Sequence, residues 1–252
     1  MFSKWFGSKK EAARDSINAN CSFLQTDMHS HLIPGIDDGA QTIEDSLELI
    51  KEFQKLGYTG IVTTPHIKSD YYPNDSAIIN NGLQELRQAL HQANIQFPVR
   101  AAAEYYVDER FIELLDSSSL LTVYNNEVLI EFSFSFEPMH IADILFRMQT
   151  KGYTPIIAHP ERYVYYHQKF QVYREFKDRG CLLQLNALSI TGYYGRSIKE
   201  VAEKLLLEKL YDYCGTDMHH LRHAESLRNL AGSKAFAALR EYPFRNRNIR
   251  LV

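Results

Sequence analysis

The sequence lacks a long hydrophobic segment. No apolar run in its 252 residues approaches the roughly 20 residues that a membrane-spanning helix requires. The first residues, Met1–Lys10, carry lysines and aromatics but not the apolar core of a secretory signal. We therefore expect a cytoplasmic protein. Linkers, repeats and low-complexity stretches are also missing, so we expect one domain over residues 23–252, preceded by a loosely ordered leader at 1–22.

Cysteine is scarce as well. Cys21, Cys181 and Cys214 are widely spaced and form no CxxC pair, which favours a reducing compartment. A cysteine-dependent phosphatase needs an arginine a few positions after its cysteine, on a loop that binds phosphate. Cys21 and Cys181 have no suitable arginine, and Arg222 is too far along the chain from Cys214. The sequence therefore excludes that mechanism.

No excess of charge of one sign is present. Lysine and arginine total 28 against 31 aspartates and glutamates, for a formal net charge of −3. A nucleic-acid-binding protein needs a basic track, so this balance argues against a nuclease. The chain is 45% hydrophobic and 23% charged, which is typical of globular proteins.

Short apolar runs alternate with helical patterns along the chain. The candidate strands are Gln25–His29, Gly60–His66, Val99–Glu104, Val128–Phe132, Thr154–His159, Cys181–Asn186 and Tyr211–Asp217. The candidate helices are Gln41–Leu56, Ser76–Asn94, Asp108–Asp116, Pro138–Lys151, Lys169–Arg179 and Ser197–Lys209. Such alternation implies parallel strands joined by right-handed crossovers. Because no eighth strand follows convincingly, we predict an α/β fold, a distorted TIM-like (β/α)7 barrel.

Two helix starts can be predicted in detail. Thr42 is followed three residues later by Asp45, an acidic variant of the capping box. Pro138 stands where the first position of another helix is expected, a position that proline favours.

The ends of the candidate strands carry ionisable residues. In a parallel α/β fold these ends share one face, and that face carries the active site. Six of the seven candidate strands carry histidine, aspartate or glutamate as their last or next-to-last residue, and such groups are costly to gather in one place unless they are paired or bind metal. We therefore predict a metal centre. Its candidate ligands are His29, His31, His66, Glu104, Glu131, His159, Asp217 and His219.

The spacing of these residues supports the metal centre. His29 and His31 are two positions apart, so in a strand both side chains point to the same side and can hold one ion. Asp217 and His219 have the same spacing. A mixture of imidazoles and carboxylates suits zinc, manganese or iron better than calcium. The candidates exceed what one ion needs, so two or three ions bridged by a carboxylate are expected.

The ordered set of motifs resembles the polymerase and histidinol phosphatase (PHP) superfamily. The segment His31–Gly39, and the later Gln184-Leu185-Asn186 with Gly192, are similar to one branch of it. That branch consists of bacterial protein-tyrosine phosphatases from capsule and exopolysaccharide operons (CpsB/CapC-type). The motifs shared with the superfamily are His29-Ser30-His31, Thr64-Pro65-His66, Ala103-Glu104, His159-Pro160-Glu161-Arg162 and Asp217-Met218-His219.

The resemblance implies a seven-stranded barrel of the PHP type with a trinuclear site, usually of manganese; iron, zinc, cobalt or magnesium are alternatives. Carried over by position, the first ion is held by His29, His31, Glu104 and Asp217. Glu104 bridges to a second ion, which Glu131 and His159 complete. A third ion is held by Asp38, His66 and His219. Asp37 stays open as the alternative to Asp38, because spacing alone does not separate two adjacent aspartates.

The resemblance also implies which residues act on the substrate. Arg162 matches an arginine that contacts the substrate phosphate, as a planar and bidentate anchor. Arg222 is the candidate for a second such arginine, although relatives usually carry asparagine after the final histidine and place the arginine farther on. A metal-activated hydroxide attacks phosphorus in line. A phenolate leaves easily, so the need for a general acid is mild, and His219 or water is the candidate.

The resemblance implies a function in polysaccharide synthesis. The expected reaction is hydrolysis of phosphotyrosine, with a bacterial tyrosine autokinase that controls capsular polysaccharide export as the partner. Tyrosines in the expected rim loops are candidates for walls around a tyrosine ring, or for loop packing. Two alternatives stay open: a small-molecule phosphatase of the histidinol-phosphate kind, and a metal-binding regulatory module without activity. The oligomeric state stays open too.

Overall fold

The computed structural model describes residues 20–117 and 119–251. Its strands are all paired in parallel and occupy seven positions around a curled sheet. The second and third positions are each divided in two, giving the strands β1 (Thr26–Asp27), β2 (Gly60–Thr63), β3 (His66–Ile67), β4 (Val99–Ala101), β5 (Glu104–Tyr106), β6 (Glu127–Glu131), β7 (Thr154–Ala158), β8 (Leu182–Asn186) and β9 (Tyr213–Gly215).

The sheet closes on itself. The strand order is β1-β2-β4 in one part and β3-β5-β6-β7-β8-β9 in the other. The last strand returns to the first, because the Asp217 amide donates to the His29 carbonyl (2.7 Å) and the His31 amide to the Met218 carbonyl (3.0 Å). Ser30 and Met218 form a parallel bridge at the same place. The predicted seven-position α/β barrel is confirmed.

The prediction of unbroken second and third strands is wrong. Thr64 and Pro65 separate β2 from β3, and proline has no amide hydrogen to donate to a neighbouring strand. The third position breaks at the same level, between β4 and β5. Two hydrogen bonds carry the pairing across the break, from the Ala102 amide to the Thr63 carbonyl and from the Glu104 amide to the Pro65 carbonyl. The break leaves His66 and Glu104 as registered neighbours on β3 and β5.

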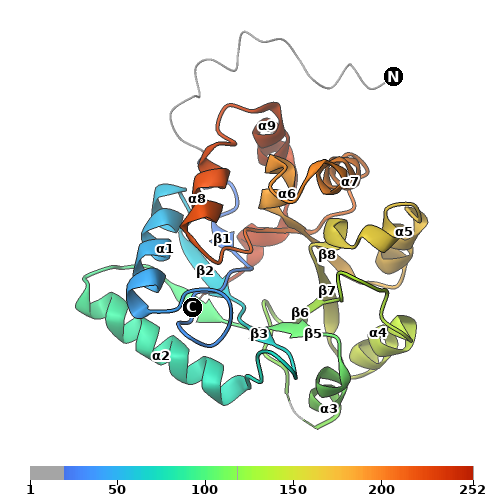
Figure 1. The fold of residues 1–252 in the computed structure, drawn as a ribbon, viewed down its shortest axis with the longest axis horizontal. Helices are drawn as coiled ribbons and strands as arrows, with labels where there is room; N and C mark the ends of the chain where they lie inside the picture. The colour runs from blue at the N-terminus through green and yellow to red at the C-terminus, as the bar shows by residue number, and fades with distance from the viewer. Residues whose placement is uncertain (1–19, 118, 252) are drawn as a thin grey trace.

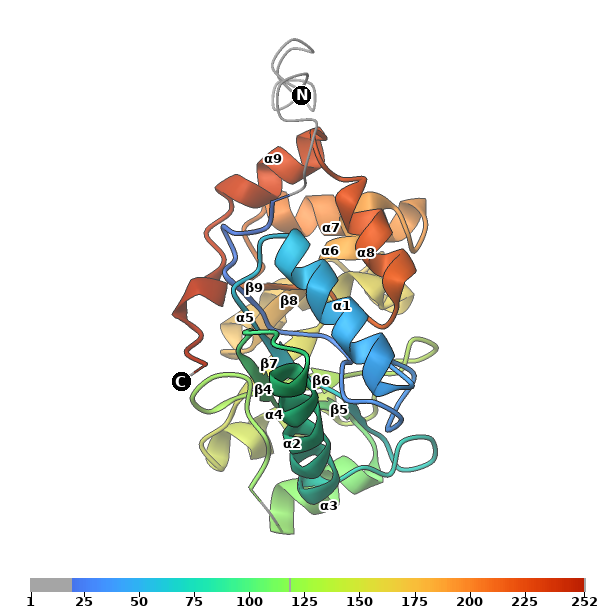
Figure 2. The same ribbon diagram turned by 90° about the vertical axis from the view of Figure 1, so that its left-hand side faces the viewer.

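Helices surround the strands (Figure 1), and α1 and α2 pack on each other across one side of the barrel (Figure 2). The α-helices are α1 (Ile43–Lys55), α2 (Ser76–Gln92), α3 (Glu109–Ser117), α4 (Ile141–Thr150), α5 (Gln171–Asp178), α6 (Ala187–Thr191), α7 (Arg196–Leu207), α8 (Leu221–Arg228) and α9 (Lys234–Glu241). Three 3-10 turns are η1 (Pro160–Arg162), η2 (Val164–Tyr166) and η3 (Arg245–Asn248). The helices α6, α8 and α9 were not predicted from the sequence.

One of the two predicted helix starts is confirmed. Thr42 caps α1, and its reciprocal capping box with Asp45 is present. The other is wrong, because Pro138 lies outside α4. That helix begins at Ile141, after His140 adopts a left-handed conformation with φ of 57° that a regular helix start at Pro138 would not allow.

Two layers of apolar side chains hold the barrel. The small interior layer includes Met28, Val62, Leu129 and Ile156, and a larger layer lies between the strands and the helices. All three cysteines are free and buried, and they pack as small core residues. Burial raises the pKa of the Cys181 thiol to about 12, so this thiol has little thiolate at neutral pH.

The predicted leader lies almost wholly outside the described residues, which begin at residue 20. Cys21, near the end of that leader, is buried in the outer apolar layer, and its amide donates to the Leu56 carbonyl at 2.6 Å. Within the described part of the chain, no helix combines the length and the apolar character needed to cross a membrane.

Candidate metal centre

Loops and strand ends bring nine ionisable side chains together at the carboxyl end of the barrel. His29 and His31 follow β1, His66 begins β3, Glu104 begins β5, and Glu131 ends β6; His159 follows β7, Asp217 and His219 follow β9, and Asp38 lies before α1. These are the nine predicted ligands. The ligand atoms of eight of them form three overlapping groups: His29, His31, Glu104 and Asp217; His66, Glu104 and Glu131; and His31, Asp38, His66 and His219. The ninth, His159, lies beside the second group, near Glu104 and Glu131.

The first group is fully buried and corresponds to the predicted first ion. The Nε2 atoms of His29 and His31 face each other at 3.3 Å. Asp217 Oδ1 lies 3.2 Å from His29 Nε2 and 3.3 Å from His31 Nε2. Glu104 Oε2 lies 3.1 Å and 3.4 Å from the same two nitrogens. The two imidazoles and two carboxylates thus surround one small volume.

The second group is centred on Glu104 and Glu131. His159 Nε2 lies 3.1 Å from Glu104 Oε1 and 3.6 Å from Glu131 Oε1, as expected for the predicted second ion. His66 Nδ1 also approaches these carboxylates, at 3.2 Å from Glu104 Oε2 and 4.0 Å from Glu131 Oε2. Sequence reasoning placed His66 with the third ion alone. Its two ring nitrogens instead face two different groups.

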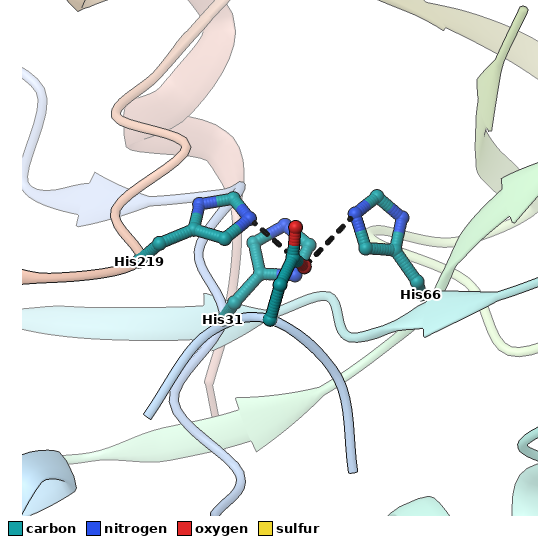
Figure 3. Close-up of side chains that lie close together, drawn as sticks. His31, His66 and His219 are labelled. Atoms are coloured by element: carbon teal, nitrogen blue, oxygen red, sulfur yellow. Dashed lines mark ion pairs between the residues drawn. The ribbon is translucent and has the colours of Figure 1, made fainter. Parts of the chain in front are cut away.

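The third group lies nearest the surface. Asp38 Oδ1 is 3.5 Å from His66 Nε2 and 3.4 Å from His219 Nε2. Figure 3 shows the rings of His66 and His219 pointing toward this carboxylate from opposite sides, with His31 beside it. The rings of His31 and His219 stack with 3.9 Å between centroids. The Asp38 side chain is 52% exposed, so this group is open to solvent.

Asp37 and Asp38 have different surroundings. The Asp37 side chain is buried, and its Oδ2 is 2.8 Å from His31 Nδ1. The same carboxylate accepts hydrogen bonds from the amides of Gly39 and His66. Asp37 therefore orients a candidate ligand, while Asp38 faces the candidate site directly. This geometry favours Asp38 as the ligand.

Hydrogen bonds at Nδ1 determine how three histidines present their other nitrogen. A carbonyl oxygen can only accept, so His29 donates Nδ1–H to Gln184 Oε1 (3.0 Å), and His219 donates Nδ1–H to the Asp217 carbonyl (2.8 Å). His31 donates in the same way to Asp37. When a cation takes the place of the proton on Nε2, each ring directs its Nε2 lone pair into the centre, which is the arrangement of metal-binding histidines. For His219 this favours a ligand role over a general-acid role.

The surroundings of one carboxylate oxygen, at the middle of the cluster, indicate whether a cation fits there. Glu104 Oε2 is buried and accepts no hydrogen bond, although imidazole nitrogens of His29, His31 and His66 lie within 3.4 Å. A buried carboxylate without a hydrogen-bond donor is costly, unless a cation compensates its charge. The mixed oxygen and nitrogen donors also suit a divalent transition metal. The residues present therefore fit the predicted metal ions.

The crowded charges shift the pKa values of both the carboxylates and the histidines of the centre. Burial raises the pKa of Glu131 well above its usual range, and the neighbouring charge of Glu104 raises it further. Burial alone would lower the pKa of His29, but Glu104 and Asp217 outweigh it and raise that pKa to about 10. His159, which burial and Arg162 affect in the same direction, has its pKa lowered to about 4. Cations would compensate the excess of negative charge.

Two glycines make room for the first pair of histidines. A Cβ atom on Gly39 would lie 2.4 Å from the His31 Cβ, and one on Gly215 would lie 2.6 Å from the His29 Cβ. Both distances are shorter than any real contact of that kind. The backbone thus approaches His29 and His31 as closely as only glycine allows. Asp217 and His159 themselves adopt left-handed conformations, with φ of 50° and 32°. Such strain is typical of functional sites.

Asp37 provides a direct test of the histidine orientation. We expect Asp37→Asn to weaken metal affinity by about 10–100-fold, because the uncharged amide supports His31 less well than the carboxylate. Metal titration of the apoprotein measures the effect. Asp75→Asn is the control, since Asp75 caps α2 and is neither in a candidate metal group nor among the residues that line the cavity. Equal metal affinity of Asp37→Asn and the wild-type protein would contradict the orienting role.

Arg162 enters the site between two aromatic rings. Its Nη1 is 2.9 Å from Asp217 Oδ2, which also accepts from Asn186 Nδ2 at 2.9 Å. The guanidinium lies 4.4 Å from the centre of the Phe134 ring and 4.2 Å from that of Tyr194. Stacking on both faces fixes the plane of the guanidinium and leaves its edges for hydrogen bonds.

A cavity of about 260 Å³ lies above the cluster. Candidate ligands form its floor, and Arg162, Phe134 and Tyr194 line it together with His220 and His223, which sequence reasoning did not single out as site residues. Arg222 is not among the lining residues. It lines a neighbouring groove with Asp45 and Glu48, so its predicted contact with phosphate gains no support from the cavity.

The rim tyrosines divide into two sets. Tyr194 lines the cavity, and Tyr72 stacks on the His66 ring with 5.3 Å between centroids. Tyr163 and Tyr166 are fully buried and pack against each other. One set therefore lies at the candidate site, and the other packs in the interior of the loops.

A closed parallel barrel with imidazoles and carboxylates converging below an arginine-lined cavity defines a class, the metal-dependent hydrolases of the α/β-barrel type. The profile of the family described as capsular polysaccharide synthesis, CpsB/CapC, matches residues 25–230. The chain belongs to this family, as the resemblance predicted.

Individual relatives agree with the family. The chain is 27% identical over 197 residues to tyrosine-protein phosphatase YwqE of Bacillus subtilis, covering 78% of each. It is 29% identical over 196 residues to putative tyrosine-protein phosphatase CapC of Staphylococcus aureus, covering 77% of each. It is also similar to a chain from the crystal structures of YwqE from Bacillus subtilis and CpsB from Streptococcus pneumoniae, described as unique metal-dependent tyrosine phosphatases. That match has a TM-score of 0.74 and 25% identity, and it covers 87% of this chain and 96% of the other.

Proposed function

We propose that this protein is a metal-dependent protein-tyrosine phosphatase. The observation that carries the proposal is the convergence of three Nε2 lone pairs, from His29, His31 and His219, with buried carboxylates directly below the Arg162 cavity. Membership of the CpsB/CapC family supports the same activity, because relatives of this chain are tyrosine-protein phosphatases.

The proposed ligand sets correspond to the three groups, except that His159 takes the place of His66 in the second set and His31 belongs to the first set alone. His29, His31, Glu104 and Asp217 hold one ion; Glu104, Glu131 and His159 hold a second, with His66 near it; and Asp38, His66 and His219 hold a third. Manganese is the proposed metal. Bound divalent ions lower the pKa of water and stabilise negative charge at phosphorus.

The side chains around the ions position the substrate. Arg162 binds phosphate oxygens with the edge of its guanidinium, while Asp217 and the rings of Phe134 and Tyr194 prevent it from rotating. The two rings also give the cavity apolar walls, against which the phenol ring of a phosphotyrosine packs. Burial of the floor excludes bulk water and strengthens these electrostatic contacts.

The proposed physiological substrate is a phosphorylated bacterial tyrosine autokinase that controls capsular or exopolysaccharide synthesis, and the proposed location is the cytoplasm. Both proposals rest on the capsule family to which the chain belongs.

Substrate comparison tests the proposed activity. We expect the manganese-loaded protein to hydrolyse a phosphotyrosine peptide with a kcat/KM at least about tenfold above that for histidinol phosphate, because the aromatic walls contact a phenol ring. Phosphate release is measured with manganese, cobalt, zinc and magnesium in turn. Preference for histidinol phosphate would favour the small-molecule phosphatase, and inactivity with every metal would favour the regulatory module.

A further inference from the structure

His223 differs from the candidate ligand histidines in how its ring is held. It lies on α8, is 6% exposed and lines the cavity. Its Nδ1 faces the His219 backbone amide at 3.2 Å. An amide N–H can only donate, so Nδ1 of His223 accepts and the ring proton resides on Nε2. His29, His31 and His219 are bonded the opposite way, each donating from Nδ1.

The proton on His223 Nε2 is available to a ligand. Within the described part of the chain, the ring forms a hydrogen bond at Nδ1 with the His219 amide, lies near the Asp217 backbone and lines the cavity. The ring itself is held in place, because Tyr193 packs against it edge to face with 5.0 Å between centroids and His220 lies at 3.9 Å. His223 is therefore a pre-oriented, neutral hydrogen-bond donor in the wall of the cavity.

A phosphate group in the cavity needs such donors. Apart from the candidate ligands, the polar side chains that line it are those of Arg162, Tyr194, His220 and His223, and Arg162 is the one arginine among these lining residues. Arg162 comes from the loop after β7, whereas His223 comes from the helix after β9. A phosphate between them would receive donors from two separate elements.

We propose that His223 binds the substrate phosphate, donating Nε2–H to one of its non-bridging oxygens. This proposal rests on the proposed phosphatase function and names a second phosphate-binding side chain beside Arg162. A neutral donor suits this position, because His219 lies beside His223, with 5.8 Å between the ring centroids, and is itself a proposed ligand of a cation. A neutral imidazole donates to phosphate without adding a positive charge next to that cation.

A purely structural role for His223 makes a different prediction. If its purpose were to accept from the His219 amide, only Nδ1 would matter. Two variants separate the roles, since an asparagine oxygen takes the position of Nδ1 and a glutamine amide takes that of Nε2. His223→Asn keeps the acceptor and removes the donor to phosphate. His223→Gln keeps the donor and removes the acceptor.

Calorimetric titration of the manganese-loaded protein with inorganic phosphate tests the proposal, with metal content measured on the same samples. We expect His223→Asn to keep its metal and to raise the Kd for phosphate about tenfold or more, as loss of a hydrogen bond to a charged group does. We expect His223→Gln to stay within about threefold of the wild-type Kd. Glu225→Gln, an exposed change on α8, is the matched control.

The proposal would be overturned if His223→Gln weakened phosphate binding more than His223→Asn does. If His223→Asn binds phosphate like the wild-type protein, or if the two variants lose metal and phosphate affinity together, His223 serves only to support His219. Because the probe is inorganic phosphate, the result does not depend on whether phosphotyrosine is the substrate. A wild-type protein that binds phosphate through His223 but hydrolyses no phosphotyrosine would contradict the proposed function alone.

Discussion

Replacement of Glu104 by glutamine is expected to remove most of the bound metal and to lower kcat/KM by roughly a thousandfold, as the loss of several kcal/mol of transition-state stabilisation does. Glutamine has the same shape, but it carries no charge. Glu104 Oε2 lies within 3.4 Å of nitrogens of His29, His31 and His66, and Oε1 lies 3.1 Å from His159 Nε2. One carboxylate thus belongs to two of the three groups, so its loss affects both of them directly.

Metal content and phosphate release from an aryl phosphate, measured on the same preparation, check this prediction. Glu127→Gln is the matched control. Glu127 is also buried, but it begins β6 at the other end of the strand and pairs with Arg245 and Tyr213. This control is expected to reduce stability while keeping the metal content of the folded protein. A Glu104→Gln protein that retains its metal and its activity would be incompatible with the proposed bridging role.

Arg162→Lys is expected to lower kcat/KM by about 10²–10³-fold while leaving metal content unchanged. Lysine keeps the charge, but it has neither the planar fork that grips two phosphate oxygens nor a flat face for Phe134 and Tyr194. Asp217 keeps its hydrogen bond from Asn186 in the variant, so the first group of ligands stays in place.

Steady-state kinetics with a phosphotyrosine peptide, together with metal analysis, measure the effect of Arg162→Lys. Arg222→Ala serves as the comparison and is expected to change kcat/KM less than about threefold, because Arg222 lines the neighbouring groove. Loss of metal from Arg162→Lys would show instead that the arginine acts mainly by holding Asp217. A large effect of Arg222→Ala would restore it as a phosphate ligand.

The barrel and the gathering of the nine candidate ligands were predictable from the sequence for one physical reason. Parallel strands joined by helices place all their carboxyl ends on one face, so residues as distant as His29 and Asp217 must meet there. The break in the second and third strands, at the level of Pro65, was harder to predict from the sequence. Proline rules out one hydrogen bond, but the matching break between β4 and β5 depends on tertiary pairing.

The finer parts of the site depend on side-chain directions that spacing does not specify. Asp37 and Asp38 are adjacent in a loop, and only their contacts in three dimensions show that Asp37 bonds to His31 while Asp38 faces His66 and His219. Phe134 and Tyr194 belong to separate loops, so no periodicity marks them as partners of Arg162. Likewise, the role of His223 becomes visible only when its hydrogen bond to the His219 amide is known.

The central claim is that a cluster of cations occupies the carboxyl end of the barrel. Crystals of the purified protein, measured above and below the manganese absorption edge, test it most directly. The predicted result is anomalous density at the centres of the three groups, enclosed by Glu104, Asp217 and His66 among others. Anomalous density that is absent from these groups in metal-supplemented crystals, or that lies elsewhere on the molecule, would contradict the claim.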